Sequence, residues 1–73
     1  MKILNEQKFG VPTESFAVGA TSAGYTLEYS ADGVNWTSLD KSTPANEVHL
    51  ISGCPKNVFW RLKNNVGEAL IQW

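Results

Sequence analysis

The side chains best suited to acid–base and nucleophilic chemistry are scarce in this chain, which has one histidine, His49, and one cysteine, Cys54. Such catalysis needs a nucleophile, a base and a group that orients the base, all held within hydrogen-bonding distance. His49 lies between Val48 and Leu50 in an alternating segment, and this position predicts a solvated side chain. The sequence therefore predicts a protein that is not an enzyme.

The possible metal ligands also lack the spacing of a metal site. The acidic residues that could bind calcium are scattered along the chain, at Asp32, Asp40, Glu47 and Glu68. They follow no calcium-loop spacing, and a chain with one Cys and one His cannot build a Cys/His zinc site by itself. The lone cysteine also forms no internal disulfide. We therefore predict no metal ion and no cofactor.

Aromatic residues offer a different kind of chemistry, because an exposed ring can stack on a sugar or pack against another protein. The chain has three Trp, two Tyr and three Phe residues. Trp36 is the ring that would contact a glycan if the chain binds carbohydrate. Trp60, by contrast, shares its predicted strand face with Val58 and Leu62, and apolar neighbours of this kind favour a core position for most of the rings.

Three residues are candidates for an interface with another protein. Phe59 falls on the same strand face as Arg61 and Lys63, which indicates either a contact surface or a ring covered by the Arg61 side chain. Trp73 is the last residue, and it either closes the bottom of the domain or reaches a neighbouring molecule. We predict that Phe59, Arg61 and Trp73 belong to the interface.

Length and charge limit the classes of partner. Six Lys and Arg against seven Asp and Glu give a net charge of −1, which offers no positive field for nucleic acid or anionic lipid. The N-terminal segment lacks the apolar core of a secretory signal, and no apolar run is long enough to cross a membrane. The initiator Met predicts a complete chain, located in the cytoplasm of a host cell or released from it with a virion.

A chain of 73 residues has room for one core, so we predict a single domain over residues 1–73. A domain of this size buries only about 60% of its unfolded-state surface. Two outcomes stay open for its stability. Either it folds as a well-packed monomer, or homo-oligomerisation or docking on a larger body completes its core.

Short apolar segments separated by turn residues must position all of these side chains, and they predict an all-β domain without a long helix. Tyr25, Leu27 and Tyr29 alternate with polar residues before Asp32-Gly33, a pair that tolerates positive φ and predicts a hairpin. We expect seven antiparallel strands, over residues 2–8, 15–20, 25–30, 35–39, 47–52, 58–63 and 68–73.

The same alternation predicts which side chains face the core. In the second strand it places Phe16, Val18 and Ala20 on one face. In the fifth strand it places Val48 and Leu50 toward the core, with His49 and Ile51 on the other side.

Two segments of the chain, 25–37 and 51–68, resemble the second half of a fibronectin type III domain. In the first, the Ser-Ala-Asp-Gly turn that begins at Ser30 leads to Trp36; in the second, Gly53 and Pro55 precede a strand in which an aromatic residue is followed by Arg61. The resemblance implies a small immunoglobulin-like β-sandwich, with Cys54 as a small buried apolar residue. The hairpin that contains Trp36 also resembles, locally, one in discoidin-type carbohydrate- or lipid-binding domains.

These observations leave two classes of function. In the first, the chain is a structural interaction module, most plausibly an auxiliary (decoration) protein of a phage capsid or other virion assembly that docks on a larger protein shell. The polar loops at 31–35, 40–46 and 64–67 would then face outward. In the second, the chain is a carbohydrate-binding module that uses exposed aromatic residues such as Trp36.

Overall fold

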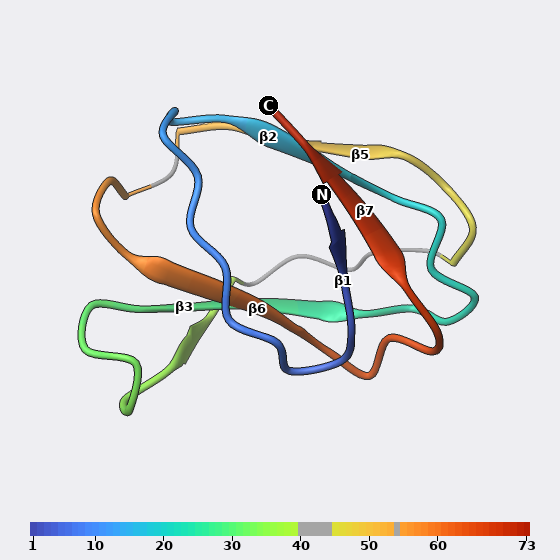
Figure 1. Ribbon diagram of the computed structural model, residues 1–73, viewed down its shortest axis with the longest axis horizontal. Coiled ribbons are helices and arrows are strands. Elements are labelled where there is room, and N and C mark those ends of the chain that lie inside the picture. The colour runs from blue at the N-terminus through green and yellow to red at the C-terminus, as the bar shows by residue number, and fades with distance from the viewer. Residues whose placement is uncertain (40–44, 54) are drawn as a thin grey trace.

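The computed structural model describes residues 1–39, 45–53 and 55–73, which form two antiparallel β-sheets and contain no helix. One sheet has four strands in the order β1-β7-β2-β5, and the other has three in the order β4-β3-β6 (Figure 1). The strands are β1 (Lys2–Ile3), β2 (Phe16–Gly19), β3 (Thr26–Ser30), β4 (Thr37–Ser38), β5 (His49–Ile51), β6 (Phe59–Lys63) and β7 (Ala69–Gln72). The all-β prediction is confirmed for this part of the chain, with every strand shorter than expected.

The predicted hairpin forms two of the three strands of the smaller sheet, with β3 at the centre. Strand β3 pairs with β4 on one side and with β6 on the other, where Leu27 lies opposite Leu62. Gly33 has a φ of 78°, as the turn prediction required. The Asp32 carboxylate accepts hydrogen bonds from the backbone N–H groups of Val34 and Asn35, both at 2.8 Å, so the turn is fixed by its own side chain.

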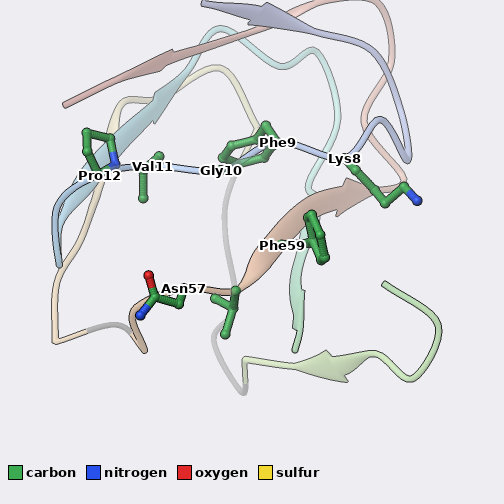
Figure 2. A pocket seen from close by; sticks show the side chains of 8 residues that line it. Lys8, Phe9, Gly10, Val11, Pro12, Asn57 and Phe59 are labelled. Carbon is green, nitrogen blue, oxygen red and sulfur yellow. The ribbon is translucent and has the colours of Figure 1, made fainter. Parts of the chain in front are cut away.

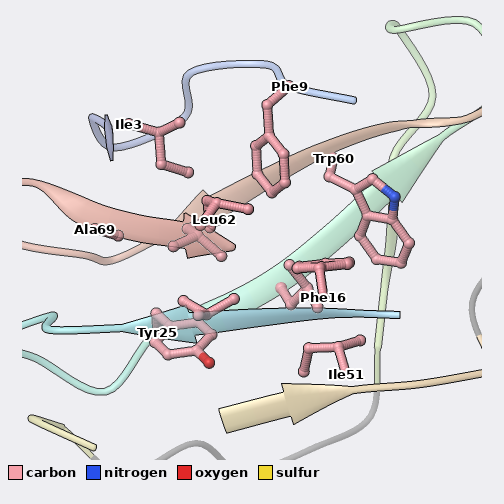
Figure 3. Packing of buried hydrophobic residues seen from close by; sticks show 11 residues of the cluster. Ile3, Phe9, Phe16, Tyr25, Ile51, Trp60, Leu62 and Ala69 are labelled. Atoms are coloured by element: carbon pink, nitrogen blue, oxygen red, sulfur yellow. The ribbon is translucent and has the colours of Figure 1, made fainter. Parts of the chain in front are cut away.

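The hydrophobic core lies between the two sheets and includes Trp60 of β6 (Figure 3). The Trp60 ring lies 5.1 Å from the ring of Phe16 in the opposite sheet and 5.5 Å from that of Tyr29, measured between centroids. The alternation predicted for β6 is confirmed, because Trp60 and Leu62 are buried whereas Phe59 is exposed. The buried apolar residues are Ile3, Phe9, Phe16, Val18, Tyr25, Leu27, Ile51, Trp60, Leu62, Ala69 and Ile71.

The orientation predicted for the fifth strand was wrong. Val48 and Leu50 are 73% and 81% exposed, whereas Ile51 is buried and His49 is half-buried, with its ring 5.9 Å from that of Tyr25. Both faces of this segment carry apolar side chains, so alternation alone could not choose between two registers that differ by one residue. Pairing chose between them, because Ile51 lies opposite the buried Phe16.

Two further expectations failed at strand ends. The first strand ends at Ile3 instead of extending to residue 8, because the chain then leaves the four-stranded sheet and crosses to β6, where the Glu6 N–H donates to the carbonyl of Leu62 at 2.8 Å (Figure 1). Ala20 was expected on the same face as Phe16 and Val18, which are buried, but it is exposed and has a φ of 65°, which ends β2 at Gly19. The roles predicted for Asp40 and Cys54 concern residues outside the described ranges.

Candidate functional site

The outer face of the four-stranded sheet carries exposed apolar side chains, and we call this surface the apolar face. Ala17 of β2 lies between Leu50 of β5 and Gln72 of β7. Two residues farther along β2, Gly19 lies between Val48 and Leu70. Leu50, Val48, Leu70 and the adjacent Trp73 are all exposed. The apolar face comprises Ala17, Gly19, Val48, Leu50, Leu70 and Trp73.

Small residues along β2 make the apolar face concave. Ala17 lies directly opposite both Leu50 and Gln72, so its short side chain forms a floor between two longer ones. A methyl group added at Gly19 would lie 3.3 Å from Cγ2 of Val48, so glycine leaves room for that side chain. A hollow of about 500 Å³ opens at the Ala17 end of this face, and its lining includes Leu50, Gln72 and Trp73, which is 57% exposed.

Charged groups lie at the border of the apolar face. Lys2 of β1 is opposite Leu70 in the register, and its Nζ lies 3.9 Å from Oε2 of Glu68. Both side chains are largely exposed, so the pair adds little to stability. An apolar centre with a charged border is the usual composition of a protein–protein interface.

The outer face of the three-stranded sheet is built differently, around an ion pair. Glu28 of β3 lies opposite Arg61 of β6, and Arg61 Nε donates to Glu28 Oε1 at 2.7 Å. Ser38 of β4 donates to the other carboxylate oxygen at 3.2 Å, and Arg61 Nη1 lies 3.8 Å from Oε1 of Glu6. Glu28 is only 8% exposed, because these partners cover it. We use the name polar network for these four residues, Glu6, Glu28, Ser38 and Arg61, together with Trp36, whose ring lies against the Arg61 guanidinium.

Trp36 and Arg61, predicted for two different functions, lie together in this network. The Arg61 guanidinium carbon is 4.2 Å from the centroid of the Trp36 ring, a cation–π distance. One face of the indole is therefore occupied within the chain, and a sugar could stack only on the other face. Arg61 is similarly engaged by Glu28, so it is a structural residue of this face.

Phe59 and Trp73, the other two predicted interface residues, lie on opposite sheets. Phe59 begins β6 in the three-stranded sheet and is 45% exposed, with Lys8 Nζ 5.9 Å from its ring centroid. Trp73 follows β7 in the four-stranded sheet and belongs to the apolar face. The structure thus separates the predicted interface into two surfaces, and only Trp73 lies among other exposed apolar residues.

The turn at Asp32 is polar and fully hydrogen-bonded. The pKa of Asp32 is held well below its usual range by the N–H of Asn35, then by the N–H of Val34, the hydroxyl of Ser30 and the side-chain amide of Asn35. The carboxylate is therefore ionised at neutral pH and is already engaged by groups of its own loop. This arrangement stabilises the turn.

Sequence reasoning missed Val48, Leu50 and Leu70 as surface residues. One signal was present, because residues 48–51 and 69–71 carry apolar side chains on both faces of a short strand. In a chain with a single core, only one side of such a strand can face that core, so the apolar side chains of the other side are left on the surface.

Comparison with protein-family models, with curated proteins and with solved structures found no match to this chain. Within the described ranges, no group of three or more His, Cys, Asp or Glu side chains is arranged to hold a metal ion. The same part of the chain contains no helix that could span a membrane.

Proposed function

We propose that this chain is a structural interaction module that docks on a larger protein through its apolar face. The observation that supports the proposal most directly is the cluster of exposed Val48, Leu50, Leu70 and Trp73 side chains around the small residues of β2. Contiguous exposed apolar surface is uncommon on proteins that stay monomeric and marks interaction sites. Burying such side chains in an interface recovers about 25 cal/mol per Å² of apolar area.

The immunoglobulin-like identity is a further part of the proposal. It is supported by two packed antiparallel sheets of four and three strands, with β3, β4 and β6 together in the smaller one. One feature departs from the immunoglobulin arrangement, in which the seventh strand joins the sheet of the third and sixth strands. Here β7 lies between β1 and β2. This exchange places Leu70 and Trp73 beside β2 and so contributes one wall of the apolar face.

The larger body that we propose is a repeating protein shell, such as a virion. A face this small supports only a weak single contact, and a shell with many copies compensates by multivalency. The near-neutral charge of the chain suits a protein surface better than a nucleic acid.

The test is binding of the purified chain to particles from the source lysate. Quantitative mass spectrometry of density-gradient fractions should find the chain in fixed ratio to the major shell protein. In co-sedimentation, Leu50→Ser and Trp73→Ala should weaken binding at least tenfold. Val34→Ser, which removes an equally exposed apolar side chain from the loop after β3, should bind as the natural chain does.

Two results would overturn this proposal. If Leu50→Ser and Trp73→Ala bind like Val34→Ser, the apolar face is not the docking surface. If the chain is absent from the particle fractions, the virion assignment fails, and the purified protein should be tested on a glycan array with Trp36→Ala as the control variant.

A further inference from the structure

Strand β6 lies at an edge of the three-stranded sheet, and the N-terminal segment pairs with only part of that edge. Glu6 donates to the Leu62 carbonyl at 2.8 Å, and Phe9 and Trp60 exchange two backbone hydrogen bonds of 2.9 and 2.8 Å. Phe9 and Trp60 thus form one hydrogen-bonded pair of an antiparallel ladder. The next such pair in this register would be Val11 with Val58.

That next pair does not form. No backbone hydrogen bond joins Val11 and Val58, both of which are described residues, and the two segments diverge after Gly10 (Figure 2). Farther along, a side-chain ion pair connects the two segments, with Lys56 Nζ 3.2 Å from Glu14 Oε1. The divergence leaves a cleft of about 570 Å³ lined by residues 8–12 and 57–59. The cleft therefore lies along the part of the β6 edge where the backbone pairing begun by Phe9 and Trp60 stops.

The lining of the cleft combines main-chain groups, apolar side chains and one cation. Val11 and Val58 are half-buried against the core, and the exposed Phe59 lines the same cleft. Lys8 lies at the end of the cleft with its Nζ 5.9 Å from the centroid of the Phe59 ring. Among the described residues, no carboxylate oxygen lies within the 4.0 Å of Nζ that would define an ion pair with Lys8.

We propose that this cleft binds an extended peptide segment of another protein that carries a carboxylate side chain. The peptide main chain would pair with Val58 and Val11, in the manner by which extended peptides add to exposed strand edges. Its carboxylate would lie near Lys8, and an apolar side chain would pack on Phe59. This site is separate from the apolar face, and the inference does not rest on the proposed function.

A peptide accounts for the lining better than a sugar does. A sugar carries hydroxyl groups in place of a row of alternating N–H and C=O groups, so it cannot continue the pairing that Phe9 and Trp60 begin. The backbone N–H and C=O groups of Val11 and Val58 do not bond to each other. An extended peptide could pair with them, because its own N–H and C=O groups alternate in the same way.

The experiment is a selection of random dodecapeptides displayed on phage, carried out with the full chain. Three variants separate the contributions: Gly10→Trp fills the cleft, Lys8→Glu reverses its charge, and Lys63→Glu reverses a charge at the opposite end of β6. A side chain at Gly10 has room, since a Cβ there meets no atom within 4 Å. Amide NMR spectra establish that each variant is folded.

Selected peptides should contain Asp or Glu and should lose at least tenfold in affinity on Gly10→Trp and at least fivefold on Lys8→Glu. Lys63→Glu and Leu50→Ser should leave their affinity unchanged. Bound peptide should slow hydrogen exchange of the Val58 amide at least tenfold.

Three outcomes would overturn the inference. The first is a selection in which no peptide depends on Gly10. The second is a peptide that binds but leaves exchange at Val58 unchanged. The third is a cleft that responds in NMR titration to glucuronic acid and to none of the selected peptides, because that result would assign it to carbohydrate.

Discussion

The two outer faces of this small protein differ in where their side chains find partners. On the three-stranded sheet, Arg61 contacts Glu28, Glu6 and Trp36, so the polar network is satisfied within the chain. On the four-stranded sheet, Leu50 is 81% exposed, and its cross-strand neighbour is an alanine. A face whose groups are paired internally stabilises the fold, whereas a face with unburied apolar groups gains most from a partner. Substitutions on the two faces should therefore have opposite effects on stability and binding.

The largest effect on stability is expected at the centre of the polar network. Arg61→Met leaves the buried Glu28 carboxylate without its cation, and we expect a loss of about 3 kcal/mol in the free energy of unfolding. Urea unfolding of this variant and of Lys63→Met, on the same strand, measures the difference. The double variant Glu28→Gln/Arg61→Met should recover part of the loss. Equal stability of Arg61→Met and Lys63→Met would contradict the comparison.

Two tryptophans, one on each outer face, allow a direct contrast. Trp36→Ala removes the ring that covers the Arg61 guanidinium and should cost about 1 kcal/mol. Trp73→Ala should change stability by no more than about 0.5 kcal/mol, the usual limit for a surface position. Thermal unfolding of both variants is the measurement. A larger loss from Trp73→Ala would mean that the terminal ring supports the domain itself.

The Asp32 turn provides a test by pH on the three-stranded side. The folded pKa of Asp32 is depressed, so its contribution to stability is complete above about pH 4, the unfolded value. As the pH falls below 4, the unfolded chain takes up the proton first, and that contribution is lost. In Asp32→Ala, stability measured by urea unfolding should vary less between pH 4 and pH 2 than in the natural chain. Glu68→Ala, a carboxylate beside the apolar face, serves as the control and should keep the natural pH dependence.

The smallest effect is expected on the apolar face itself. The double variant Val48→Thr/Leu50→Thr keeps strand propensity while removing exposed apolar area, so unfolding free energy should stay within about 0.5 kcal/mol of the natural value. Sedimentation velocity at high concentration should show weaker self-association than in the natural chain. A stability loss above 2 kcal/mol would mean that these side chains are buried in the folded monomer.

Local sequence determined much of this protein. Period-2 alternation in residues 25–30 and 58–63 predicted two strands, and Asp32-Gly33 predicted the turn that follows the first of them, because side-chain direction and positive φ are properties of neighbouring residues. The same alternation predicted that Trp60 lies in the core and Phe59 outside it. The sequence also showed directly that the chain has few side chains suited to acid–base or nucleophilic chemistry.

Only the tertiary structure decided which residues lie together on the surface. The inward side of β5 depended on its pairing with β2, because Val48, Leu50 and Ile51 are all apolar and satisfy either register. The meeting of Arg61 with Glu28 and Trp36, and the position of β7 between β1 and β2, join residues that are far apart in sequence. Contacts of this kind depend on how whole sheets pack, and no local pattern of residue types encodes them.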